Sequence, residues 1–100
     1  MKTREEYIAL IASHAEELQN TFGIISLRLF GSVARNQHHD GSDVDIYVEM
    51  PPKFSLVVRL KSYLEALLGC PVDIIRKHQH LNPFLLKEIE RDGIEVIAER

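Results

Sequence analysis

Two carboxylates lie one residue apart in the segment SDVDIYVE, residues 42–49. Alternate side chains of a strand point to the same face, so Asp43 and Asp45 are expected to project together. Like charges this close raise each other's pKa, and Mg²⁺, which is typically held by one or two carboxylates plus substrate phosphates, would neutralise them. The spacing therefore favours a magnesium site. The plainer alternative is that Asp43 caps the strand and Asp45 lies on a solvated face.

Two further features indicate metal and phosphate chemistry. Gly31 and Ser32 directly follow a strand-like apolar run and open a short helix, which offers backbone N–H groups and a hydroxyl to a phosphate. Asp73 interrupts the apolar segment VDIIRK and supplies a third acid that could lie beside the other two. Each feature also has an ordinary explanation, since Gly-Ser pairs often mark simple turns and an isolated acid often lies at a strand edge.

The elements that must position these residues follow from hydrophobic spacing and turn residues. In chain order they are predicted as a helix over 4–21, a strand over 24–30, a short helix over 32–36, a strand from Asp43 to the prolines at 51 and 52, a helix over 55–69, a strand over 72–77, a helix over 83–91 and a strand over 94–98. This order predicts an α/β (α+β) fold with a mixed sheet of four strands. We expect the helices to pack mainly on one face and the aspartates to face an open side.

Several helix ends carry capping signals. Thr3 with Glu6 three residues later matches a capping box. Ser32 and Ser55 are the predicted N-caps of the short helix and the long helix that follow. Asn82, directly before a proline, is the predicted N-cap of the last helix.

Composition narrows the class of protein. A chain of 100 residues with 45% hydrophobic residues fits one domain over residues 1–100. The formal charge of −3 gives no basic footprint for direct nucleic-acid binding. No apolar run approaches the roughly 20 residues that span a bilayer, and the lone Cys70 excludes an internal disulfide. We expect a cytoplasmic protein without a membrane segment.

The spacing of the candidate site residues resembles that of a known superfamily. Gly-Ser, ten intervening residues, then Asp-Val-Asp, with a later acid inside a strand, is similar to the pattern of the nucleotidyltransferases that include DNA polymerase β. Within that superfamily, the segments LFGSVAR and SDVDI in so short a chain look most like the minimal nucleotidyltransferases (MNT), the stand-alone catalytic domains of prokaryotes. Residues 24–77 carry this resemblance.

The resemblance implies a role for each matching residue. Gly31 and Ser32 would bind the terminal phosphates of the nucleotide. Asp43 and Asp45 would hold two magnesium ions. Asp73 would bind the metal nearer the acceptor and help to deprotonate the attacking hydroxyl.

The residues that follow the Gly-Ser pair allow more than one interpretation. Arg35 would contact a phosphate if the resemblance holds, and is otherwise a solvated loop arginine. Asn36 stands where the family usually has glycine, but asparagine tolerates the left-handed backbone conformation, so the turn is expected to survive. His38 and His39 lie in the polar loop before the acids and either touch the nucleotide or acceptor, or belong to the loop surface.

The resemblance also implies a reaction and a partner. Minimal nucleotidyltransferases are commonly encoded beside a helical HEPN protein, as antitoxin and toxin, so the expected reaction is transfer of AMP from ATP to a tyrosine hydroxyl of that ribonuclease. A hetero-oligomer is expected, or a homodimer in the partner's absence, with an apolar patch for the partner on the helix over 55–69 or that over 83–91. Two alternatives stay open: a binding module that neutralises its partner by occlusion, and a small-molecule nucleotidyltransferase of the aminoglycoside type.

Overall fold

The computed structural model of the protein describes residues 1–99. The elements, in order, are α1 (Arg4–Ser13), α2 (Ala15–Phe22), β1 (Ser26–Phe30), α3 (Gly31–Ala34), β2 (Val44–Glu49), α4 (Phe54–Leu68), β3 (Val72–Arg76), α5 (Pro83–Asp92) and β4 (Ile94–Ile97). Within this described part, none of the helices has the length and apolar character needed to cross a bilayer.

The strands form one mixed sheet in the order β3-β2-β1-β4. β1 pairs antiparallel with both β2 and β4, whereas β2 and β3 are parallel. A parallel pair needs a crossover connection, and α4 supplies it. The predicted four-stranded mixed sheet is therefore confirmed, with β3 at one edge.

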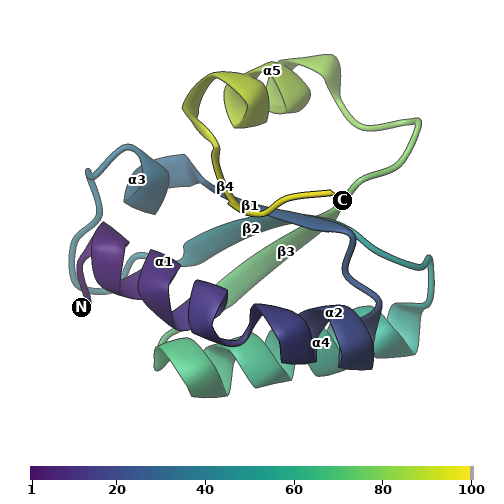
Figure 1. The fold of residues 1–100 in the computed structure, drawn as a ribbon. Coiled ribbons are helices and arrows are strands. Elements are labelled where there is room, and N and C mark those ends of the chain that lie inside the picture. Colours follow the sequence, from purple (N-terminus) through teal and green to yellow (C-terminus); the bar gives the residue numbers. More distant parts are fainter. Residues whose placement is uncertain (100) are drawn as a thin grey trace.

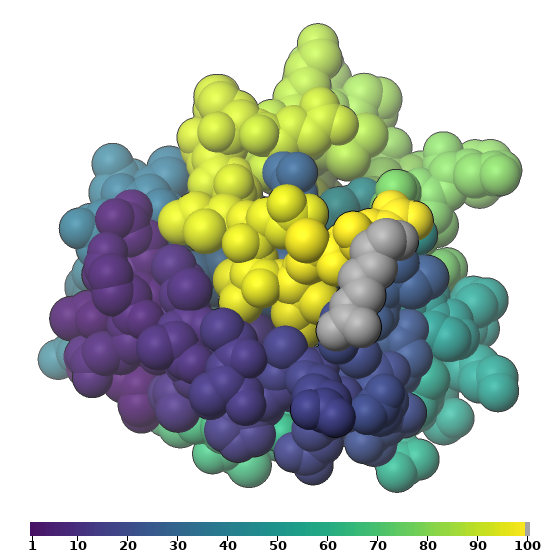
Figure 2. Space-filling model, in the orientation of Figure 1, coloured from purple at the N-terminus to yellow at the C-terminus, as the bar shows by residue number. Residues whose placement is uncertain are grey.

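The helices cover the two faces of the sheet unequally. α1, α2 and α4 pack on one face, and α5 lies alone on the other (Figure 1). The larger core fills the first face, where Leu29, Ile46 and Leu64 are fully buried. In the space-filling view, α1 and α2 (purple to dark blue) pack beside the yellow C-terminal strand, while α5 rises above it (Figure 2). The prediction that helices pack mainly on one face is confirmed.

The second face carries a smaller cluster that stops short of the aspartates. Phe30, Tyr47 and Ile89 are buried together between the sheet and α5. Because side chains alternate along β2, Tyr47 shares its face with Asp45, two residues earlier. α5 therefore covers the Tyr47 end of this face and leaves the Asp45 end open.

The predicted helix over 4–21 is wrong in one respect, because the structure divides it into α1 and α2 at His14. The Nδ1–H of His14 donates to the Leu10 carbonyl at 2.9 Å, and the Ser13 hydroxyl donates to the same carbonyl at 2.8 Å. Side chains that bond to nearby carbonyls compete with the helical ladder and favour a break. The apolar spacing continues through the break, so periodicity alone did not show it.

Two of the predicted N-caps are also wrong. The short helix begins at Gly31 and α4 at Phe54, and their N-caps, Phe30 and Lys53, make no side-chain capping bond. β1 runs directly into α3, so no loop residue is left to cap it and Ser32 falls inside the first turn. The Thr3 capping box and the Asn82 cap are both present, as predicted.

Candidate active site

Asp45 and Asp73 lie directly opposite each other on neighbouring strands. The parallel pairing of β2 and β3 puts their Cα atoms in register. Paired residues on adjacent strands project from the same face, with strands about 4.8 Å apart. Asp43 is exposed just before β2 begins. The sheet thus brings Asp45 and Asp73 to one end of one face, and Asp43 lies just outside the sheet, two residues before Asp45.

Asp45 is the acid whose ionisation the fold opposes most. Its pKa is raised from an ordinary value of 3.8 to about 6, mainly because burial removes water from the carboxylate and then because Asp73 and Asp43 repel its charge. Arg35 lowers the pKa, but its effect is smaller. When Asp45 is ionised, its charge lies close to those of Asp73 and Asp43. A bound divalent cation would relieve this repulsion.

The Gly31 backbone lies against the Asp45 carboxylate. Phe30, the last residue of β1, pairs with Asp45, and Gly31 follows with a φ of +74°. A Cβ atom added to Gly31 would collide with Oδ2 of Asp45. Glycine is needed here both for the left-handed backbone and for the close approach to the carboxylate. The Gly-Ser turn and the Asp45 carboxylate therefore meet at the same point of the fold.

A cleft of about 760 Å³ opens over these residues. Gly31, Ser32, Asp45 and Asp73 line one side of it, together with Arg35. Its volume falls within the range of about 300–1,000 Å³ that is usual for small-molecule and cofactor sites. Asp43 is not among the lining residues, so its carboxylate stands at the margin rather than inside.

The far side of the cleft includes residues that the sequence reasoning missed. They come from α4 and α5, and are Phe54, Val57, Val58, Lys61 and Glu88. Phe54 and Val58 are four residues apart on α4 and are large, apolar and exposed. The available signal was an apolar pair, Phe54 and Val58, at the start of a predicted helix.

The donor set is compatible with magnesium held jointly with a nucleotide. Within residues 1–99, no cluster of three His, Cys, Asp or Glu side chains is arranged to hold a metal by itself. Mg²⁺ seldom uses such a cage, because it is typically bound by one or two carboxylates plus phosphate oxygens and water. Asp45 and Asp73 could supply the carboxylates, and Asp43 could join them from the margin.

Arg35 lines the cleft, and its guanidinium also contacts Gln37 and Asp92. Its Nε–H donates to Gln37 Oε1 at 3.2 Å, and its Nη1 lies 3.7 Å from Asp92 Oδ2. The longer contact is a weak ion pair on a partly exposed side chain, worth about 0–1 kcal/mol. The guanidinium is therefore free to turn towards a phosphate at little cost.

Asn36 adopts the left-handed conformation that the turn requires. Its φ is +58°, and it is the only non-glycine residue with a positive φ among residues 1–99. The expectation that asparagine preserves this turn is confirmed.

A pair of substitutions at this position tests what the turn requires. Asn36→Ala is expected to lower the free energy of unfolding by about 1 kcal/mol, because alanine is disfavoured at positive φ. Asn36→Gly should stay within about 0.5 kcal/mol of the natural chain and bind nucleotide equally well. Urea unfolding and calorimetric titration with a non-hydrolysable ATP analogue measure both, and a strong gain in binding for Asn36→Gly would show that asparagine impairs the site.

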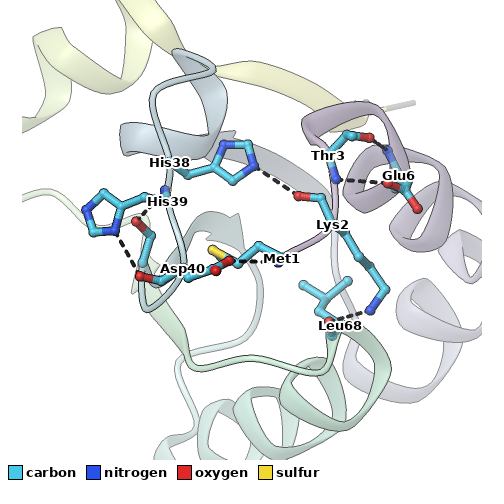
Figure 3. A network of polar contacts seen from close by, with 9 residues as sticks. Met1, Lys2, Thr3, Glu6, His38, His39, Asp40 and Leu68 are labelled. Atoms are coloured by element: carbon cyan, nitrogen blue, oxygen red, sulfur yellow. Dashed lines mark hydrogen bonds and ion pairs between the residues drawn. The ribbon is translucent and has the colours of Figure 1, made fainter.

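His38 and His39 make contacts within the loop and with the N-terminal segment (Figure 3). The Nε2–H of His38 donates to the Lys2 carbonyl at 2.9 Å, and its ring packs edge-on against Tyr7. His39 Nδ1–H donates to the Asp40 carbonyl at 2.9 Å. Neither ring lines the cleft. Of the two interpretations, the loop-surface one is favoured, with His38 fastening the loop to the segment before α1.

Comparison with known proteins identifies the family. The model of the family described as polymerase beta nucleotidyltransferase matches residues 13–100. The chain belongs to this family. A candidate protein adenylyltransferase of Methanocaldococcus jannaschii is 40% identical to this nucleotidyltransferase over 100 residues, covering 96% of this chain and 100% of the relative. The protein adenylyltransferase MntA of Thermococcus cleftensis is 36% identical over 98 residues, covering 96% of this chain and 98% of the relative.

Solved structures share the fold of this nucleotidyltransferase. A candidate minimal nucleotidyltransferase superposes with a TM-score of 0.76 at 32% identity, covering 93% of this chain and 95% of that one. A chain from the complex of a tri-AMPylated HEPN toxin of Shewanella oneidensis with its MNT antitoxin superposes with a TM-score of 0.66, covering 91% of this chain and 72% of that one. At 18% identity, this second likeness extends to the fold alone.

Proposed function

We propose that this nucleotidyltransferase transfers AMP from ATP to a tyrosine hydroxyl of a HEPN-family toxin and so acts as its antitoxin. One observation carries the proposal: the Gly31 backbone abuts Asp45, which is in register with Asp73, at the wall of a nucleotide-sized cleft. That arrangement brings a phosphate-binding turn and paired carboxylates to the same point.

Each residue of the site has a distinct part in the reaction. Asp43, Asp45 and Asp73 would hold two Mg²⁺ ions, which when bound supply charge stabilisation at the α-phosphate and at the leaving pyrophosphate. Gly31 and Ser32 would bind the β- and γ-phosphates through N–H groups and the hydroxyl. Arg35 would leave Asp92 for a phosphate oxygen.

The transfer itself is an in-line displacement at phosphorus. Asp73 accepts the proton of the acceptor hydroxyl, whose oxygen forms a bond to the α-phosphorus while the bond to the pyrophosphate oxygen breaks. The exposed position of Asp73 suits this part, because the carboxylate must be reachable by a side chain of another protein.

The acceptor class is supported by the relatives. The Thermococcus cleftensis relative is named a protein adenylyltransferase, and the Shewanella oneidensis complex pairs an AMPylated HEPN toxin with an MNT antitoxin. The described part of the chain is taken up by the sheet and the helices that frame the cleft. An acceptor surface provided by a second protein fits this arrangement.

The test is transfer to a HEPN-family protein from the same genome, followed by intact mass spectrometry. Incubation with ATP and Mg²⁺ should add mass in whole AMP units, and Asp43→Ala and Asp45→Ala should each abolish the gain. Asp40→Ala is the control, because Asp40 is an exposed acid of the loop before β2 that pairs with the N-terminal amine and does not line the cleft. A tight complex without any mass gain would contradict the proposal and favour neutralisation by occlusion.

A further inference from the structure

The edge strand β3 presents main-chain groups that the fold leaves unpaired. The N–H of Val44 donates to the Pro71 carbonyl at 3.0 Å, and the N–H of Lys77 donates to the Val48 carbonyl at 2.7 Å. Since main-chain groups alternate in direction along a strand, the odd-numbered residues of this segment face β2. The N–H and C=O groups of Val72, Ile74 and Arg76 therefore point away from the sheet.

Within residues 1–99, only one of these outward groups, the N–H of Val72, has a hydrogen-bond partner. Glu65 Oε2 accepts a hydrogen bond from the Val72 N–H at 3.1 Å. Among residues 1–99, no hydrogen bond reaches the main-chain groups of Ile74 or the N–H of Arg76. An open edge of this kind is a template for an added strand, and proteins usually block such edges.

The candidate active-site cleft follows this same edge. Asp73, Ile74 and Ile75 all line it, so the outward groups of Ile74 lie next to the acids. Below the edge, α4 contributes Phe54 and Val58, whose exposed fractions are 84% and 46%. A strand of another protein lying along β3 would cover these apolar side chains and reach Asp73 at the same time.

Charge argues against a second copy of this protein as the occupant. Antiparallel self-pairing centred on Ile74 would put the Asp73 side chains of the two copies diagonally across the seam on one face, each with Asp45 beside it on β2, and the chain already carries a net charge of −3. Like charges that meet across a strand pair in this way are unfavourable. The edge instead suits a different chain that has neutral or basic side chains opposite the acids.

We propose that the acceptor protein binds as an extended segment that hydrogen-bonds to the open edge of β3. The residue opposite Asp73 carries the hydroxyl that receives AMP, because paired side chains on neighbouring strands share a face and lie about 5 Å apart at Cβ. The adjacent residues of the segment point to the opposite face and pack on Phe54 and Val58. This inference rests on the proposed function and adds the docking mode and the chemistry of the acceptor segment.

Amide exchange in the unmodified complex tests the docking mode. With ¹⁵N-labelled protein, the amides of Ile74 and Arg76 should exchange rapidly when free and at least about tenfold more slowly with the acceptor bound. Asp73 and Ile75, whose amides already face β2, should change less. Unchanged exchange at Ile74 in a complex that still transfers AMP would overturn the proposal, as would protection that grows with protein concentration in the acceptor's absence.

Arg76→Pro removes an outward donor without removing a bond of the sheet, which an edge strand tolerates at such a position, and Arg76 does not line the cleft. AMP transfer to the acceptor should fall by about tenfold or more, while the affinity for a non-hydrolysable ATP analogue stays unchanged. Arg76→Lys, which keeps the N–H and the charge, is the matched control and should transfer normally. Equal transfer by both variants would overturn the docking mode, whereas absence of transfer by the natural chain would instead refute the proposed function.

Discussion

Asp45→Asn is expected to abolish AMP transfer and, at the same time, to make the nucleotide-free protein more stable at pH 7. Asparagine has the same shape but cannot hold Mg²⁺ as a carboxylate does, so transfer should fall by about 10³-fold or more. The gain in stability has a separate cause. The pKa of Asp45 is about 6 in the folded chain, against an ordinary value of 3.8, because of burial and the charges of Asp73 and Asp43.

The size of this effect depends on pH. Because folding raises the pKa, ionised Asp45 destabilises the folded state at pH values above about 6, and the penalty disappears as the pH falls below 3.8. A pKa raised this far corresponds to about 3 kcal/mol in a dry site, and partial exposure reduces this to about 1–2 kcal/mol. Asp45→Asn should therefore raise the Tm by about 5 °C or more at pH 7 and by little at pH 3.5.

Differential scanning calorimetry at the two pH values measures this stability effect. Asp43→Asn provides the comparison, because Asp43 is exposed and removing its charge should raise the Tm less while still impairing transfer. Saturating Mg²⁺ and ATP analogue should stabilise the natural chain but not the Asp45 variant. A lower Tm for Asp45→Asn at pH 7 would show that the carboxylate is satisfied in the free protein, contrary to the structure.

Gly31→Ala is expected to be the most disruptive single-methyl change in the site. The new Cβ would sit at a φ of +74° and would meet Oδ2 of Asp45. The left-handed conformation costs about 1–2 kcal/mol for alanine, and overpacking adds about 1–3 kcal/mol. The free energy of unfolding should therefore fall by about 2–5 kcal/mol, and transfer should be lost because either the turn or the carboxylate must move.

Gly41→Ala separates the cost of backbone strain from the cost of the collision with Asp45. Gly41 also has a positive φ, +93°, but a Cβ there would meet nothing within 4 Å. Its replacement should cost about 1–2 kcal/mol from backbone strain alone and leave nucleotide binding unchanged. Urea unfolding and calorimetric titration with the ATP analogue compare the two variants. Equal losses of stability, with binding retained in both, would mean that the Gly31 contact with Asp45 has no importance.

The prediction of secondary structure succeeded where local signals and packing agree. The Thr3 capping box and the Asn82 cap both depend on neighbouring residues only. The break at His14 was missed because the apolar spacing runs straight through it. The caps assigned to Ser32 and Ser55 failed because where a helix begins depends on how the preceding segment enters it.

By itself, the sequence determined the periodicities, the turn chemistry and the order of elements, and through them the mixed sheet and the face that carries Asp45. These are properties of residues close together in the chain. Only the tertiary structure decided that Asp73 pairs with Asp45, that Gly31 touches its carboxylate, and that Phe54 and an open β3 edge border the cleft. Strand order and register are set by long-range packing of both sheet faces, and this information is spread over the whole chain rather than contained in any one segment.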